Sequence, residues 1–194
     1  IETIGRNILQ EYDPALLDGP PQAVPIETII ETKFDLTLEY HCLRKNGSIL
    51  GETIFDEGAA ILYDQDEKRY RLIAVKAGTI LVEERLCVDR LLGRLRFTCA
   101  HELGHWVLHQ KLYSGTGDVA AYEGKTSLDE SYGLVEWQAD ALATALLMPL
   151  PQIKRSFYRL RAGRSHEHLV AEMARTFQVS KQAMRIRLET RNLI

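Results

Sequence analysis

Cysteine is scarce in this chain of 194 residues, and its pattern excludes two kinds of protein. The three cysteines, Cys42, Cys87 and Cys99, are odd in number and far apart, and no two of them form a CxxC pair. A disulfide scaffold and a cysteine-based zinc site are therefore not expected. A reducing compartment is the simplest location for such a chain, so we expect a cytoplasmic protein.

Long apolar runs are also missing, and no secretory signal is expected from the first residues given. No stretch approaches the ~18–20 apolar residues that span a bilayer, and residues 1–12 contain no basic segment followed by an apolar block. Apolar residues make up 45% and charged residues 26% of the chain, which is typical of a globular protein and not of a disordered one. We expect one hydrophobic core, or a main domain with a small appendage, and no contact with a membrane.

Positive charge is low overall but concentrated at one end. The net charge of −3 argues against a general nucleic-acid binder. Residues 1–149 contain 14 Lys/Arg and 24 Asp/Glu, a balance of −10, whereas residues 150–194 contain 10 Lys/Arg and 3 Asp/Glu, a balance of +7. The asymmetry predicts a basic segment that either folds onto the acidic body or meets an acidic partner. We therefore divide the chain into a main domain, 1–149, and a basic helical segment, 150–194.

The hydrophobic pattern predicts an α+β fold. Short apolar segments separated by turn signals predict an antiparallel or mixed sheet, with strands at 34–40, 49–55, 59–63, 71–75 and 79–83. Helical spacing, prolines at helix starts, and Ser165 and Ser180 as N-caps predict helices, which cover 1–12, 25–32, 88–110, 134–148, 151–161, 166–177 and 181–192. The polar stretch 111–133 is long for a structureless loop, which favours a functional lid or a mobile segment.

One motif in the 88–110 helix carries chemistry. His101-Glu102-Leu103-Gly104-His105 is an HExxH sequence, and a helix places its two histidines one turn apart on one face. Two imidazoles at that spacing can bind one zinc ion at ~2.0–2.1 Å, and zinc lowers the pKa of a bound water to roughly 7. Glu102 lies about 100° around the helix, where it can take a proton from that water and pass it to a leaving amine.

A third ligand is expected from the following helix. A catalytic zinc ion needs three protein ligands and leaves its fourth position to water. Glu136 and Asp140 lie one turn apart in an ExxxD sequence, and we expect Glu136 to be the third ligand. Asp140 would accept the free imidazole N–H of His101 or His105 and fix its tautomer. The alternative is a helix face that is acidic by chance.

Two neighbouring residues are interpreted as structural. His109 follows His101 by eight residues, which on a straight helix is ~12 Å along the axis and too far for the same metal ion. We expect His109 to pack or to support a ligand. Cys99 is interpreted as a small core residue.

Three segments together resemble the ImmA/IrrE-type zinc metallopeptidase family. Residues 96–109, RFTCAHELGHWVLH, resemble the family signature RFTLAHELGH…H. Residues 139–149, ADALATALLMP, resemble a second signature that ends in LLMP, and residues 177–188, FQVSKQAMRIRL, are similar to the usual ending F-x-VS-x-x-A-M-x-x-RL. The resemblance spans residues 96–188 and is far more specific than HExxH alone.

The resemblance implies a zincin-like fold, in which a small, mostly antiparallel sheet packs on the helices that carry HExxH and ExxxD, followed by a helix-turn-helix-like tail. It also implies a cytoplasmic zinc endopeptidase that cuts an XRE-type helix-turn-helix repressor and so derepresses mobile-element, phage or stress-response genes. Carried over position by position, His101, His105 and Glu136 are ligands and Glu102 is the base. Asp140 stands where many relatives have Asn, and it can still accept an imidazole N–H.

Two further expectations concern partners. Residues 166–192 have a helix-turn-helix rhythm with a basic last helix, so the alternative function is a DNA-binding or repressor-binding regulator with a structural or inactive zinc site. The cations of that helix are Lys181, Arg185, Arg187 and Arg191. For the peptidase, substrate would add as a strand to an exposed sheet edge, and we expect strand 79–83 to be that edge. The sequence does not specify an oligomeric state.

Overall fold

The computed structural model describes residues 1–114 and 130–194 of an α+β fold. The strands are β1 (Thr37–His41), β2 (Gly51–Ile54), β3 (Gly58–Asp64), β4 (Arg69–Val75) and β5 (Thr79–Glu83). The helices are α1 (Glu2–Tyr12), α2 (Ala15–Asp18), α3 (Ile26–Lys33), α4 (Leu92–Tyr113), α5 (Glu130–Leu147), α6 (Leu150–Leu160), α7 (His166–Phe177) and α8 (Lys181–Glu189), with short 3₁₀ helices at Glu84–Leu86 and Asp89–Leu91.

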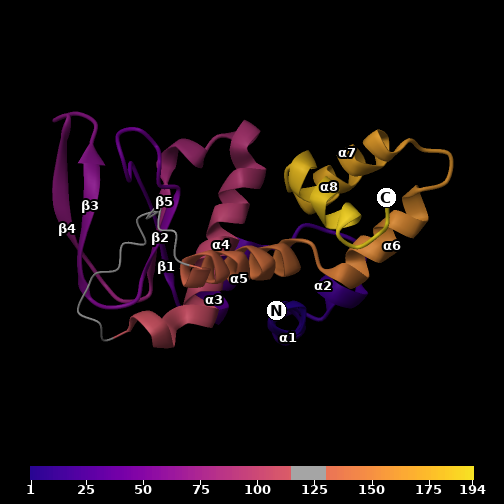
Figure 1. Ribbon diagram of the computed structural model, residues 1–194, viewed down its shortest axis with the longest axis horizontal. Helices are drawn as coiled ribbons and strands as arrows, with labels where there is room; N and C mark the ends of the chain where they lie inside the picture. Colours follow the sequence, from indigo (N-terminus) through magenta and orange to yellow (C-terminus); the bar gives the residue numbers. More distant parts are fainter. Residues whose placement is uncertain (115–129) are drawn as a thin grey trace.

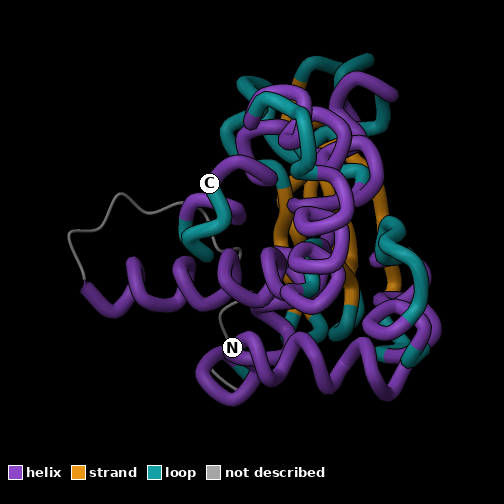
Figure 2. The backbone as a smooth tube through the Cα atoms, turned by 90° about the vertical axis from the view of Figure 1, so that its right-hand side faces the viewer, coloured by secondary structure: helices purple, strands orange, loops and turns teal. Residues whose placement is uncertain are grey.

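The strands lie at one end of the molecule and α6, α7 and α8 at the other, with α4 and α5 between them (Figure 1). Viewed from the end that α6 to α8 form, the helices stand in front of the strands (Figure 2). The fold is therefore elongated. Its middle is occupied by α4 and α5, which carry the HExxH and ExxxD sequences.

Two small sheets make up the β part. In the three-stranded sheet the order is β1-β5-β2, with β1 parallel and β2 antiparallel to β5. Strands β3 and β4 form a separate antiparallel hairpin. The prediction that strand 79–83 is an exposed edge is wrong, because this strand is β5, the central one, and all five of its residues are buried. Its continuous apolar run suits a strand that is covered on both faces.

All five predicted strands are present, with ends that differ by up to three residues. The first begins at Thr37 and not at residue 34, since Asp35 adopts a left-handed backbone conformation (φ 54°) after α3. The strand order is mixed and is not a simple meander, because β1 and β5 are neighbours although three strands separate them along the chain.

The main apolar core draws on all eight helices. A second, smaller cluster fills the space between the hairpin and the central sheet, and includes Leu43, Ile54, Leu62 and Leu81. The main core continues across residue 149, since Leu146 and Phe177 belong to the same buried cluster. The division of the chain at residue 149 remains a prediction about function.

The C-terminal helices begin as predicted. The Ser165 hydroxyl accepts a hydrogen bond from the His168 backbone N–H, and the Ser180 hydroxyl accepts one from Ala183 at 3.0 Å. Gln178 ends α7 in the left-handed conformation (φ 53°). The turn then packs against the start of α4, where a Cβ on Gly93 would lie 2.8 Å from the Ser180 nitrogen.

The predicted loop 111–133 is shorter than expected at both ends. α4 continues through Tyr113 and α5 begins at Glu130, and the rest of the predicted lid, residues 115–129, lies outside the described residues. The short helix α2 lies between the two helices predicted at 1–12 and 25–32. Among the helices described, none is long and apolar enough to cross a membrane.

Candidate metal site

The candidate site lies where α4 crosses α5. A Cβ on Gly104 would lie 3.0 Å from the Cα and the carbonyl oxygen of Ala139, so the two backbones approach closely at this point. Small residues at the crossing bring the neighbouring side chains together. His101 and His105 of α4 thereby face Glu136 of α5.

Three potential ligand atoms converge at this crossing. Glu136 Oε2 lies 3.3 Å from His101 Nε2, and Glu136 Oε1 lies 3.3 Å from His105 Nε2. The two Nε2 atoms are 2.9 Å apart. One ligand atom from each residue lies within 4.8 Å of the others, so all three could bind a single ion.

The chemistry of these donors fits a metal ion. Glu136 Oε1 is buried, and among the described residues no group donates a hydrogen bond to it. Two imidazole nitrogens that face each other can share only one proton, whereas a metal ion would accept a lone pair from each of them and from the carboxylate. Two histidines and one glutamate are a ligand set of catalytic zinc sites.

The far ring nitrogens of both histidines have partners. His101 Nδ1 lies 2.8 Å from Asp140 Oδ1, so of the two histidines allowed by the sequence, Asp140 contacts His101. His105 Nδ1 lies 3.1 Å from His109 Nδ1, and His109 Nε2 lies 3.0 Å from Gln138 Oε1. Because the Gln138 oxygen can only accept, His109 donates from Nε2 and can accept from His105 at Nδ1.

His109 and Gln138 therefore support His105 much as Asp140 supports His101. His109 is buried and lies on the side of His105 away from Glu136. The sequence indicated a packing or supporting position for His109, but it gave no reason to single out Gln138.

Glu102 is held by β2. Its side chain is only 6% exposed, and the Thr53 hydroxyl lies 2.7 Å from Oε2 and 3.0 Å from the Glu102 carbonyl oxygen. A Cβ on Gly51 would lie 2.4 Å from Glu102 Oε1, so the glutamate fits only because residue 51 has no side chain. Sequence reasoning missed both Gly51 and Thr53, which follow no spacing relative to the motif.

Charge within the site shifts two pKa values in opposite directions. Burial disfavours protonation of His101, but its hydrogen bonds to Asp140 and Glu136 outweigh this and raise the pKa of His101 to about 10. Burial would raise the pKa of Glu136, yet its contacts with His101 and His105 lower it to about 2. At neutral pH the metal-free site therefore holds a carboxylate and a proton that a cation would displace.

The site opens onto a cavity of about 270 Å³. One wall is Ser48 to Gly51, which leads into β2, and another is Phe97 and Thr98 of α4. Cys99, between the cavity wall and the first histidine, is fully buried, and burial raises the pKa of its thiol. Its interpretation as a core residue is confirmed.

The four cations predicted on the last helix are divided between the interior and the surface, and Arg191 lies just beyond the end of α8 at Glu189. Arg187 is buried, donates to the Met148 carbonyl oxygen and pairs with Glu2, and Arg191 pairs with the same carboxylate. Lys181 and Arg185 are exposed. Only half of the basic side chains expected on a DNA-reading helix face solvent freely.

Comparisons with known proteins bear on the family and the fold. The family model for the IrrE N-terminal-like domain, Peptidase_M78, matches residues 63–189. Among curated proteins none matches the sequence. A solved structure of a Mycobacterium tuberculosis transcriptional regulator is similar, with a TM-score of 0.52 and 16% identity over 96% of this chain. The chain spans 45% of that regulator's length, and the likeness concerns the fold alone.

Proposed function

Because the chain belongs to the IrrE N-terminal-like domain family of peptidases, we propose that it is a zinc-dependent endopeptidase. His101, His105 and Glu136 are its zinc ligands, and Glu102 is its general base. The observation that carries this proposal is the convergence of the three ligand atoms within 4.8 Å, with the Glu102 side chain lining the same cavity. A structural zinc site is closed by four protein ligands and has no use for a buried base beside it.

Each polar side chain has a task in peptide hydrolysis. When bound, zinc supplies an acidified water and polarises the scissile carbonyl. Glu102 takes the proton from the attacking water and delivers it to the leaving amide nitrogen. The Thr53 hydroxyl fixes one carboxylate oxygen of Glu102, which leaves the other to carry the proton.

The outer hydrogen bonds orient the ligands. Asp140 keeps the His101 proton on Nδ1, and His109 does the same for His105, so that each Nε2 presents its lone pair to the metal. The Gln138 oxygen fixes the tautomer of His109. These contacts hold the imidazole rings in place before any metal binds, which lowers the cost of ordering the site.

The substrate is a polypeptide that adds to β2. Within the described part of the chain β2 pairs only with β5, so its other edge has no strand partner there and is where the substrate strand would add. This edge continues from residues 48–51, which line the cavity beside Glu102. Strand addition would carry the scissile peptide past the metal site with main-chain hydrogen bonds and little dependence on side chains.

The substrate class rests on the resemblance to ImmA/IrrE-type enzymes. We propose an XRE-type helix-turn-helix repressor in the cytoplasm, whose cleavage releases mobile-element, phage or stress-response genes. The fold shared with a transcriptional regulator is consistent with a role in gene control.

The test compares the zinc-loaded protein with Glu102→Gln in a bacterial protein extract. New N-termini identified by mass spectrometry should appear at a few defined peptide bonds with the unmodified protein and be absent with Glu102→Gln. Cuts within a helix-turn-helix repressor would support the substrate class. Identical cuts with both proteins, or none after zinc loading, would contradict the peptidase assignment.

A DNA-binding regulator is the second candidate, favoured by the +7 balance of residues 150–194. The inward-facing Arg187 and the ion pair of Arg191 with Glu2 weaken it. A gel-shift titration of the whole chain with duplex DNA at low salt decides between the two. Tight binding that weakens steeply with salt would favour the regulator, and no binding would remove it.

A further inference from the structure

A groove of about 720 Å³ runs beside the metal site toward α8. Two helices form its sides, each through residues that share one helix face. α5 contributes Trp137, Ala141 and Thr144, and α8 together with its C-cap residue contributes Ala183, Ile186 and Thr190. Because four of these six side chains are small, the two helices leave room between them for another chain.

The groove and the metal-site cavity share a wall. Phe97 lines both of them. Asp140, which holds His101, lies in the groove wall, and Trp137 directly follows the ligand Glu136. A polypeptide that leaves the cavity past Phe97 therefore enters the groove.

Large apolar side chains are exposed in this groove. Trp137 is 60% exposed and Ile186 is 50% exposed. Exposed aromatic and branched side chains that line one hollow are typical of binding surfaces, and tryptophan is enriched among the residues that dominate binding energy. A volume of this size accommodates several side chains of a ligand.

The α8 wall also carries uncompensated positive charge. Arg187 and Arg191 both line the groove, and both pair with the single carboxylate of Glu2. The other carboxylate of the groove wall, Asp140, is paired with His101, so two guanidinium groups against the Glu2 carboxylate leave one positive charge in excess at this end. A carboxylate on the occupant would complement it.

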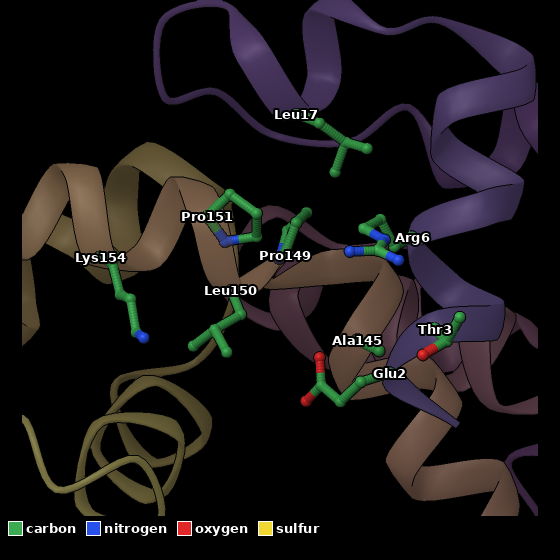
Figure 3. Close-up of a pocket in the computed structure, with 9 residues that line it drawn as sticks. All are labelled: Glu2, Thr3, Arg6, Leu17, Ala145, Pro149, Leu150, Pro151 and Lys154. Atoms are coloured by element: carbon green, nitrogen blue, oxygen red, sulfur yellow. The ribbon is translucent and has the colours of Figure 1, made fainter.

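A smaller hollow nearby does not offer the same path. It measures about 240 Å³ and lies among α1, α2 and the start of α6, with Leu17 facing Pro149 and Pro151 across it (Figure 3). It shares Glu2 with the groove but borders none of the metal-site residues. A substrate that reaches the metal site would continue into the larger groove.

We infer that the groove between α5 and α8 binds the substrate chain a short distance from its scissile bond. It takes a large apolar side chain against Trp137 and Ile186 and an acidic residue beside Arg191. The inference rests on the proposed peptidase function, and it gives the C-terminal helices a role in substrate selection. Specificity then resides in side chains of α5 and α8, while strand addition at β2 holds the main chain.

The test measures peptide binding by a zinc-loaded protein that carries Glu102→Gln. The probe is a peptide mixture made by tryptic digestion of a bacterial proteome, and bound peptides are separated on a size filter and sequenced by mass spectrometry. Retained peptides should share a large apolar residue close to an acidic one. Adding Trp137→Ala or Ile186→Ser should lower their retention about tenfold or more.

Tyr158→Ala provides the matched control. Tyr158 is 56% exposed, close to the value for Trp137, but it lies on α6 outside the groove. Tyr158→Ala should retain the same peptides as its parent. Equal retention by the Trp137→Ala and Ile186→Ser variants, or no retained peptides at all, would overturn the inference.

Digestion of the same mixture by the unmodified protein separates this inference from the proposed function. Cleavage with the same preferences in Trp137→Ala would leave the peptidase standing and remove the groove as a substrate site. Retention that depends on Trp137, without any cleavage, would preserve the groove as a peptide-binding site and remove the peptidase.

Discussion

Two clusters of charged and polar side chains flank α5, and they differ in what they leave unsatisfied. At the metal site, ring nitrogens of His101 and His105 and a carboxylate oxygen of Glu136 converge on one point. At the C-terminal end of α5, the guanidinium of Arg187 meets the Met148 carbonyl oxygen and the Glu2 carboxylate. The metal cluster contains three potential metal ligands. The Arg187 cluster already contains a cation, the guanidinium group.

This difference distinguishes a cluster that can bind a ligand from a cluster that only stabilises the fold. In the Arg187 cluster each guanidinium nitrogen of Arg187 donates to an acceptor within the chain, so the cluster stabilises the fold. In the metal cluster a buried oxygen of Glu136 has no hydrogen bond within the described residues. A substitution in the Arg187 cluster should therefore affect stability, and one in the metal cluster should affect metal binding.

The largest expected effect on stability is that of Arg187→Ala. The substitution removes a buried cation and leaves the Met148 carbonyl oxygen without its donor, which should lower the free energy of unfolding by about 2–4 kcal/mol. Zinc content per folded chain should not change. Urea unfolding with zinc analysis measures both, and Arg185→Ala, an exposed neighbour on α8, is the control, with a change within about 0.5 kcal/mol. Loss of zinc from the folded Arg187→Ala protein would contradict the distinction between the two clusters.

Gly51→Ala separates metal binding from proton transfer within the site. The new methyl group would collide with Glu102 Oε1 and displace the base, while the three ligands stay in place. Peptide cleavage should fall by roughly 100-fold, since a shift of about 1 Å in a catalytic group has that effect. Zinc content should remain near that of the unmodified protein. Full cleavage activity in Gly51→Ala would contradict the position assigned to Glu102.

The outer hydrogen bonds of the ligands should have a smaller effect. Asp140→Ala and His109→Phe each leave one imidazole without its partner, so zinc affinity should fall roughly 10–100-fold. Competition with a chromophoric chelator measures the dissociation constant. Asp140→Asn retains an acceptor and should lose less affinity than Asp140→Ala. Unchanged zinc affinity in Asp140→Ala and in His109→Phe would mean that these contacts contribute only to the packing of α4 against α5.

Glu2→Gln should have the smallest effect, and the effect should depend on pH. Burial would raise the pKa of Glu2, but Arg187 and Arg191 outweigh it and hold the pKa below its ordinary value of 4.5. A lowered folded-state pKa adds stability above pH 4.5 that is lost as the pH falls through the folded value. Because the side chain is 37% exposed, the contribution at pH 7 should be at most about 1 kcal/mol. Thermal unfolding of both proteins at pH 7 and pH 3 checks whether the difference disappears in acid.

The candidate site could be largely predicted because helix geometry is local. Spacing of one turn places His101 beside His105, and Glu136 beside Asp140, whatever the rest of the chain does. The contacts of Asp140 and His109 depend on how α4 crosses α5, which the sequence left open. Gly51 and Thr53 come from a strand about fifty residues earlier in the chain, and no spacing rule links a strand to a distant helix.

The strands were predictable as segments but not in their order. Turn residues such as Asn46-Gly47 mark where strands end, yet pairing between β1 and β5 depends on packing against α3 and α4. The strand expected at the edge is the central one, and the free edge near Glu102 belongs to β2. The continuous apolar run of β5 was the available signal for its central position.

The central claim is that His101, His105 and Glu136 form one metal site, and metal content tests it most directly. Protein purified without a histidine tag and supplied with zinc should contain close to one zinc ion per chain, and Glu136→Ala should lose most of it while still folding. Equal metal content in the two proteins, or no bound metal in the unmodified one, would contradict the account.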